Sequence, residues 1–297
     1  ETVFRLYDTY GFPVDLTSDI ARERGLSIDE PGFEAAMNAQ RAMSRAASKF
    51  NVDLRGDMSV DSQTSFVGYD GETGQGRVVA MFRGKEPVAE LKAGEEGQVV
   101  LDVTPFYAES GGQVGDKGWL TINGTEVAVV DTKKDNDLII HFTEALPAEV
   151  SGTISAKVDA AKRKETTLHH SATHLLHAAL RQVLGTHVAQ KGSLVNEERL
   201  RFDFSHFSKV TDEELSKIEA IVNEKIRENI PVVIKSLPKE EALKLGAMAL
   251  FGEKYGDVVR VVIMDPAYSV ELCGGTHVGS TGELGIFKFT GESAVAA

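Results

Sequence analysis

The chain of 297 residues is poor in cysteine and has no long apolar run. Its single cysteine, Cys273, excludes an internal disulfide and is typical of a protein from a reducing cytoplasm. No stretch approaches the roughly 18 apolar residues of a membrane helix, and nothing near Glu1 resembles a signal peptide. We therefore expect a cytoplasmic protein without a membrane partner. Since the sequence stops at "GESAVAA" without an evident end, we also expect it to be part of a longer chain.

Positive charge is also scarce, because 32 Lys and Arg stand against 45 Asp and Glu and the net charge is -13 at pH 7. This balance argues against sequence-independent binding of polyanions as the main role. A nucleic-acid partner would need local basic patches. Arg41 and Arg45 lie one helical turn apart and form either such an edge or a solvated helix face. Lys162, Arg163 and Lys164 form a second short basic run that can contact phosphate.

Three successive patterns predict an α+β protein. Residues 1–60 have helical spacing. Residues 61–160 contain short β-rich runs, among them "GQVVLDVTPFY" and "LIIHFTEA", which predict a small β-barrel or sandwich. Within them "ING" and "KKDND" are typical of hairpin turns. Residues 161–297 mix helices and strands without regular alternation, which predicts an α+β domain with a histidine-bearing helix near a mixed or antiparallel sheet.

The third part begins with the helix "RKETTLHHSATHLLHAALRQVLG", which should end at Gly185. A second helix is predicted after the capping box of Thr211 and Glu214. We expect strands at "RLRFDFS", "PVVIKSLP", "DVVRVVIMD", "YSVELC" and "LGIFKF".

The first of these helices carries four of the eight histidines. At roughly 100° per residue, His170, His174 and His177 share a stripe away from the apolar face. Residues four apart have Cβ atoms about 5–6 Å apart, so two imidazoles can reach one ion. The stripe alone fits a metal site or a solvated helix face.

A second cluster, "ELCGGTHVG", places the only cysteine four residues before His277. Gly274 and Gly275 permit positive φ and close approach of the backbone, so we expect a turn that brings Cys273 and His277 toward one point. One thiolate and three imidazoles suit tetrahedral zinc, which makes a zinc site the favoured interpretation of both clusters together. His170 and His174 are the expected helical pair, with His177 in an outer shell or uninvolved. The spacing does not settle that choice.

These motifs carry a resemblance to a known family. "HHSATHLLHAAL", "QKGSLVNEERLRFDFSH", "ALFGEKYGDVVRVV" and "SVELCGGTHVG" together resemble the editing domain of the bacterial alanyl-tRNA synthetases. "FYAESGGQVGDKG" is similar to the glycine-rich loop of the small barrel that precedes this domain. "LYDTYGFPVDLT" is similar to the end of the tRNA-recognition region.

The resemblance implies that His170, His174, Cys273 and His277 bind one Zn²⁺ per chain. It implies hydrolysis of the ester in tRNA(Ala) mischarged with serine or glycine. The resemblance also implies that the ATP-dependent ligase activity belongs to an N-terminal part that is absent from this sequence. Nothing here offers an ATP site, and "SGGQVGDKG" does not fit a P-loop.

Two roles for the zinc stay open. With three protein ligands it would activate a bound water as the nucleophile, and no side-chain base is assigned. With four ligands its shell is closed, and it would be structural or would anchor the substrate after one ligand yields. The alternative functions are a tRNA-binding module with a purely structural zinc and a protein-interaction domain without chemistry.

Two polar stretches that follow the histidine helix, "VAQKGSLV" and "RLRFDFS", contain candidates for further substrate contacts. In the family, Gly111 and Gly112 lie in a loop near the site, although here they can simply form a tight turn. We expect "VAQKGSLV" to be a loop that can face the metal, and Arg201 and Asp203 either support the pocket or pair with each other. The candidate substrate-binding residues are Gln190, Ser193, Gly274, Gly275, Arg201 and Asp203.

Overall fold

The computed structural model describes residues 62–147, 149–249 and 256–293, together with 2, 17, 21, 24–26, 28–29 and 31–33. Most of the predicted helical part, including Arg41 and Arg45, lies outside these residues, although residues 31–33 are helical. The chain divides into two compact units, and all the elements below belong to the unit Leu54–Thr290. Among the described residues, no helix is both long enough and apolar enough to cross a membrane.

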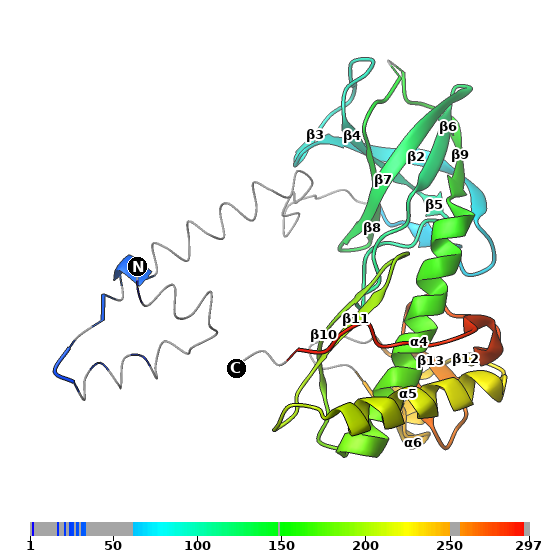
Figure 1. Cartoon of the computed structure of the whole chain (residues 1–297). Helices are drawn as coiled ribbons and strands as arrows, with labels where there is room; N and C mark the ends of the chain where they lie inside the picture. Colours follow the sequence, from blue (N-terminus) through cyan, green and yellow to red (C-terminus); the bar gives the residue numbers. More distant parts are fainter. Residues whose placement is uncertain are drawn as a thin grey trace. The chain divides into compact units, whose positions relative to one another are not determined.

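Six antiparallel strands form a closed barrel. Of the two predicted architectures, a small barrel and a sandwich, the barrel is therefore confirmed. In the barrel strand β9 (Thr153–Val158), alternate residues point inward and outward, so that Ile154, Ala156 and Val158 are buried and their neighbours are exposed. The order of the six strands around the barrel is β2 (Thr73–Arg83), β4 (Gly97–Leu101), β8 (Leu138–Thr143), β7 (Thr125–Asp135), β6 (Gly118–Ile122) and β9, which pairs again with β2 (Figure 1).

Two predicted hairpin turns are confirmed. Asn123 and Gly124 connect β6 to β7 with φ of 49° and 80°, and Asn136 has φ of 50° between β7 and β8. Asparagine and glycine tolerate this left-handed region, which suits the twist of a tight hairpin. Three short strands are added: β3 (Glu86–Pro87) lies beside β2, and β1 (Ser65–Phe66) pairs in parallel with β5 (Val103–Thr104).

The histidine-bearing helix, α4 (Ala160–Leu184), follows directly after β9 (Figure 1). Its first turn is capped by the side chain of Asp159, and it ends at Gly185 with φ of 117°, as predicted. The second predicted helix, α5 (Asp212–Arg227), begins with the expected capping box of Thr211 and Glu214. One face of α4 packs with α5 and with the strand β13 (Val258–Met264) around a common apolar core.

Two antiparallel sheets complete this α+β part. The first pairs β10 (Gln190–Val195) with β11 (Leu200–Phe204), and the second has the order β12 (Val233–Pro238), β13 (Val258–Met264) and β14 (Ser269–Leu272). A short helix, α6 (Lys239–Lys244), follows β12. The predicted α+β class, with α4 beside an antiparallel sheet, is confirmed.

A buried ion pair between Arg163 and Asp116 connects the first turn of α4 to the barrel. The guanidinium of Arg163 is hydrogen-bonded to the carboxylate of Asp116, with Nε 2.8 Å from Oδ1, and it also donates to the carbonyl oxygens of Gly68 and Pro105. Both side chains are almost fully buried. The charge of Arg163 is therefore already neutralised, and the predicted phosphate contact is wrong for this residue.

The predicted strand "LGIFKF" is wrong. This segment follows the 3₁₀ helix η1 (Thr281–Leu284) and has no strand partner among the described residues. Side chains of α5 take the place of a neighbouring strand. Asn223 binds both the N–H and the carbonyl of Phe287 at 2.8 Å, and Glu219 accepts from the N–H of Phe289 at 3.0 Å. The apolar alternation therefore packs against a helix instead of forming a sheet.

Candidate metal centre and the adjoining cavity

The histidine stripe of α4 is buried. His170, His174 and His177 are only 4%, 4% and 5% exposed, although they point away from the apolar core shared with α5. They are covered by β14, by the loop 273–277 and by a loop of the barrel. A solvated helix face is therefore excluded for this stripe.

Four side chains from two distant segments converge here. One donor atom from each of His170, His174, Cys273 and His277 lies within 4.8 Å of the other three. The sulfur of Cys273 is 3.4 Å from Nε2 of His170 and 3.3 Å from Nε2 of His277. Tetrahedral zinc, with bonds of about 2.0–2.1 Å to nitrogen and about 2.3 Å to sulfur, separates the two donors by roughly 3.5 Å. The donor set and its spacing therefore fit zinc.

Gln113, from the barrel loop between β5 and β6, fixes the orientation of His170. Its Oε1 accepts from the backbone N–H of Thr276 at 3.0 Å, which settles the orientation of the amide. The same oxygen lies 2.7 Å from Nδ1 of His170. Because an amide oxygen only accepts, Nδ1 must carry the proton, and the bare Nε2 faces the sulfur of Cys273. A lone pair directed at a thiolate is favourable when a cation lies between them.

Glu271 and Ser171 support the other two imidazoles. Oε2 of Glu271 is 3.5 Å from Nδ1 of His174, an ion-pair distance without a hydrogen bond, and Oε1 is 3.0 Å from Nδ1 of His177. The hydroxyl of Ser171 is 3.1 Å from Nδ1 of His277. Polar partners of this kind on the outer nitrogen orient metal-binding histidines.

Burial lowers the pKa of all three imidazoles in the cluster, and well below the usual value for His170 and His277. Charge on the neighbouring histidines and on Arg260 acts in the same direction. Burial alone would raise the pKa of Glu271, but the attraction of His174 and the hydrogen bond from His177 outweigh it and lower this pKa. At neutral pH the site therefore holds neutral imidazoles, which is the form that binds metal.

The loop that carries Cys273 and His277 is held by close contacts. A Cβ on Gly275 would lie 2.0 Å from Cε1 of His170, so only glycine fits there. Nη1 of Arg260 donates to the carbonyls of Cys273 and Gly275 at 2.9 and 2.7 Å. The predicted turn brings Cys273 and His277 to one point, and the close approach of the backbone occurs at Gly275. Neither Gly274 nor Gly275 uses the positive φ that glycine permits.

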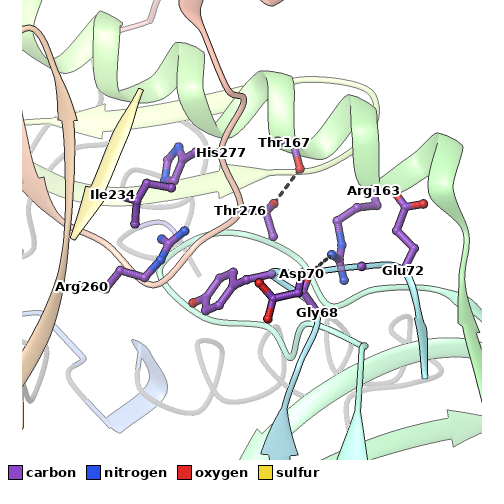
Figure 2. A pocket seen from close by; sticks show the side chains of 11 residues that line it. Gly68, Asp70, Glu72, Arg163, Thr167, Ile234, Arg260, Thr276 and His277 are labelled. Atoms are coloured by element: carbon purple, nitrogen blue, oxygen red, sulfur yellow. Dashed lines mark hydrogen bonds between the residues drawn. The ribbon is translucent and has the colours of Figure 1, made fainter. Parts of the chain in front are cut away.

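A cavity of about 560 Å³ adjoins the cluster and reaches His277 (Figure 2). Two hydroxyls in its wall, those of Thr167 and Thr276, are 2.7 Å apart. The cavity also contains Arg260 and several residues from the turn before β2. It can hold a small polar group next to the four donors.

Comparison with known proteins identifies the family. The family model described as "tRNA synthetases class II (A)" matches residues 1–162, more than half of the chain. The chain belongs to the class II tRNA synthetases. A second model, "Threonyl and Alanyl tRNA synthetase second additional domain", matches residues 259–297, which include Arg260, Cys273 and His277. The resemblance drawn from the motifs is confirmed.

Two relatives of this class II synthetase chain, both named Alanine--tRNA ligase, match along all of it. The protein from Cytophaga hutchinsonii is 55% identical over 298 residues, covering 100% of this chain and 33% of the relative. The protein from Idiomarina loihiensis is 52% identical over 298 residues, covering 100% of this chain and 34% of the relative. The chain thus spans about a third of the length of these relatives.

The other candidate residues of this synthetase chain lie outside the lining of the cavity. Gln190 and Ser193 are on strand β10, so the predicted loop is wrong. Ser193 packs against the barrel loop, where a Cβ on Gly112 would lie 2.6 Å from the Cβ of Ser193. Gly111 and Gly112 both have positive φ, as a tight turn requires. That turn also carries Gln113 into the site.

Arg201 and Asp203 form an ion pair with one another, with Nε 3.0 Å from Oδ1. Their side chains are 60% and 43% exposed on β11, whereas Phe202 between them packs toward α4 beside His177. Of the two roles considered for this pair, the geometry favours mutual pairing.

Sequence reasoning missed Gln113, Glu271, Arg260 and Tyr69. A signal existed for Glu271, because it lies two residues before Cys273 and side chains at i and i+2 share one face of a strand. Gln113 follows directly after the glycine pair of its loop, which marks a close approach of the backbone. Arg260 and Tyr69 had no local signal, since their contacts with the loop 273–277 depend on strand pairing and on the position of the barrel.

Proposed function

We propose that this chain hydrolyses the ester of tRNA(Ala) mischarged with serine or glycine, as the editing part of an alanine-tRNA ligase. The observation that carries the proposal is the convergence of three imidazoles and one thiolate beside a polar cavity. The match to a domain of threonyl and alanyl tRNA synthetases over residues 259–297 supports it, as do relatives named Alanine--tRNA ligase.

The limited selectivity of a binding pocket for alanine supports the same assignment. A pocket that selects alanine cannot strongly exclude the smaller glycine, and serine adds only one hydroxyl. Discrimination on such differences reaches roughly 10- to 200-fold, so a second, hydrolytic site is the expected remedy.

Zinc is the proposed metal, with one ion held by His170, His174, Cys273 and His277. Bound there, it would supply Lewis-acid chemistry. Gln113 holds Nε2 of His170 free as a ligand atom, and the carboxylate of Glu271 lies 3.5 Å from Nδ1 of His174. We assign no side chain as general base.

The surrounding residues would place the substrate. The hydroxyls of Thr167 and Thr276 line the cavity beside His277 and can orient an ester or a water molecule by hydrogen bonds. Gln190 stays a proposed contact to the amino acid.

A structural zinc is the second candidate, and the closed set of four protein ligands favours it. The chain would then be a tRNA-binding module that contributes no hydrolysis of its own. In either case the partners would be tRNA(Ala) and the remainder of a synthetase chain in the cytoplasm, with ligation carried out by another part of that chain.

Deacylation of Ser-tRNA(Ala) tests the proposal, measured at high enzyme concentration because a third of a synthetase can bind tRNA weakly. We expect hydrolysis by the wild-type chain and a loss of at least about 100-fold in Cys273→Ala with the fold retained. His206→Ala, which removes an imidazole outside the cluster, should keep full activity. Unfolding on removal of zinc, with no hydrolysis by the intact chain, would instead establish the structural role.

A further inference from the structure

Arg260 lines the cavity and carries a positive charge. Of the two arginines that line this cavity, Arg163 is neutralised by Asp116. Within the described residues, no carboxylate lies at ion-pair distance from Arg260. Its hydrogen bonds go to two neutral carbonyl oxygens, those of Cys273 and Gly275. Its positive charge is therefore available to a ligand.

Only one edge of the guanidinium is occupied. Both hydrogen bonds of Arg260 leave from Nη1, and an arginine offers five N–H donors. In the described part of the chain, Nη2 and Nε make no hydrogen bond. These two nitrogens form the planar fork that binds carboxylate and phosphate oxygens in bidentate fashion. The free edge is thus suited to an anion.

Tyr69 holds this guanidinium in place. The ring of Tyr69 lies 4.2 Å from Cζ of Arg260, and the Tyr69 hydroxyl donates to the carbonyl of Gly274. Phe66 packs edge-on against the same ring, with centroids 4.8 Å apart. The orientation of Arg260 is therefore fixed on one side by the metal-binding loop and on the other by an aromatic ring (Figure 2).

We propose that Arg260 binds a phosphodiester of the substrate, the one that joins the terminal nucleoside to the rest of the nucleic acid. This inference rests on the proposed function, because it takes the reacting ester to lie at the four donors. With a net charge of -13, the chain needs a local cation to receive a nucleic-acid end. Arg260 supplies one beside the proposed zinc site.

The cavity is not a general polyanion site, because the carboxylates of Asp70 and Glu72 also line it. An aminoacyl ester at the end of a nucleic acid carries charges of both signs, an ammonium group on the amino acid and a phosphodiester behind the nucleoside. A cavity with one free guanidinium and two carboxylates matches that pattern better than it matches a longer stretch of backbone.

Two small substrates separate the phosphodiester from the ester. Seryl adenosine contains the ester and no phosphate, whereas the seryl ester of cytidylyl-(3′→5′)-adenosine adds one phosphodiester. We expect the wild-type chain to prefer the dinucleotide in kcat/KM. Arg260→Gln should reduce this preference by about 10- to 100-fold, as loss of a charge-assisted hydrogen bond predicts. The rate of each variant on seryl adenosine is the reference, because it reports any effect of the two lost hydrogen bonds to the carbonyls of Cys273 and Gly275. Arg260→Lys, which keeps the charge without the fork, should be intermediate.

Arg227→Gln is the matched control, because it removes the same charge from an exposed position on α5. It should leave the preference unchanged. An equal loss on both substrates in Arg260→Gln, with or without loss of zinc, would overturn the proposal and leave Arg260 as a clamp of the metal-binding loop or a stabiliser of the reacting carbonyl. An unchanged preference would overturn it as well.

Binding of the two unesterified compounds decides the question without any hydrolysis. By NMR titration, cytidylyl-(3′→5′)-adenosine should bind more weakly to Arg260→Gln than to wild type by the same factor, and adenosine should bind equally to both. A wild-type chain that hydrolyses neither ester would refute the proposed function, whereas equal effects on both unesterified compounds would refute the role of Arg260.

Discussion

Replacement of Gln113 tests whether the barrel shapes the metal site. In Gln113→Ala, Nδ1 of His170 loses its acceptor at 2.7 Å, and the tautomer with a bare Nε2 is no longer enforced. Loss of such an outer partner typically weakens metal binding by about 10- to 100-fold, or about 1.4–2.7 kcal/mol. The N–H of Thr276 also loses its acceptor, which should lower the free energy of unfolding by about 1–3 kcal/mol.

Gln113→Glu should bind zinc at least as tightly as the wild type. A carboxylate still accepts from Nδ1 of His170 and from the N–H of Thr276, and the Thr276 hydroxyl can rotate to donate to it. A carboxylate behind a histidine ligand also makes the imidazole more basic. The contrast between the alanine and glutamate variants therefore separates the hydrogen bond from the volume of the side chain.

Competition with a chromophoric chelator measures the zinc affinity of each variant. Gln98→Ala is the matched control, because Gln98 is another buried glutamine of the barrel and its Oε1 has no hydrogen-bond partner among the residues that the structure describes. Wild-type affinity in Gln113→Ala, or an equal loss in Gln98→Ala, would refute the reasoning.

Three further changes have defined outcomes. Gly275→Ala places a Cβ 2.0 Å from His170 and should weaken zinc binding by about 10-fold or more in the chelator competition. Gly274→Ala is the control and should bind zinc like the wild type, because its Cβ would lie 3.9 Å from the nearest atom, the hydroxyl oxygen of Tyr69. Asp116→Ala leaves the charge of Arg163 buried and without its carboxylate, so the free energy of unfolding in urea should fall by about 3–5 kcal/mol. Asp203→Ala, which breaks an exposed ion pair, should lower it by less than about 1 kcal/mol. Similar losses in the two variants would contradict this prediction. Burial lowers the pKa of His141 to about 4 from 6.5, so the unfolded state binds the proton more readily. This imidazole alone should therefore lower stability by about 3 kcal/mol as pH drops from 6.5 to 4, and the difference between wild type and His141→Leu should measure this part of the pH dependence.

Local physics allowed several features to be predicted from the sequence. The turn at Asn123 and Gly124, the cap at Thr211 and the end of α4 at Gly185 each depend on the backbone preferences of one or two residues. Helical spacing and the scarcity of cysteine favoured a site that joins histidines of α4 to Cys273 and His277, although the spacing did not settle which histidines take part. The division into residues 1–60, 61–160 and 161–297 stays a prediction.

The partners of the site could not be predicted because they are distant in sequence. Gln113 lies 57 residues before His170, and Glu271 lies 94 residues after His177. The burial of the histidine stripe depends on these contacts, so helical periodicity alone could not distinguish it from a solvated face. The strand predicted at "LGIFKF" failed for a related reason, since Asn223 and Glu219 of α5 bind its backbone.

The central claim is that His170, His174, Cys273 and His277 hold one zinc ion. Metal analysis of the purified chain combined with X-ray absorption at the zinc edge tests it most directly. The account predicts about one zinc per chain, surrounded by one sulfur and three nitrogen ligands, with the sulfur signal lost in Cys273→Ala. A chain that binds no zinc, or a zinc shell without sulfur in the wild type, would contradict it.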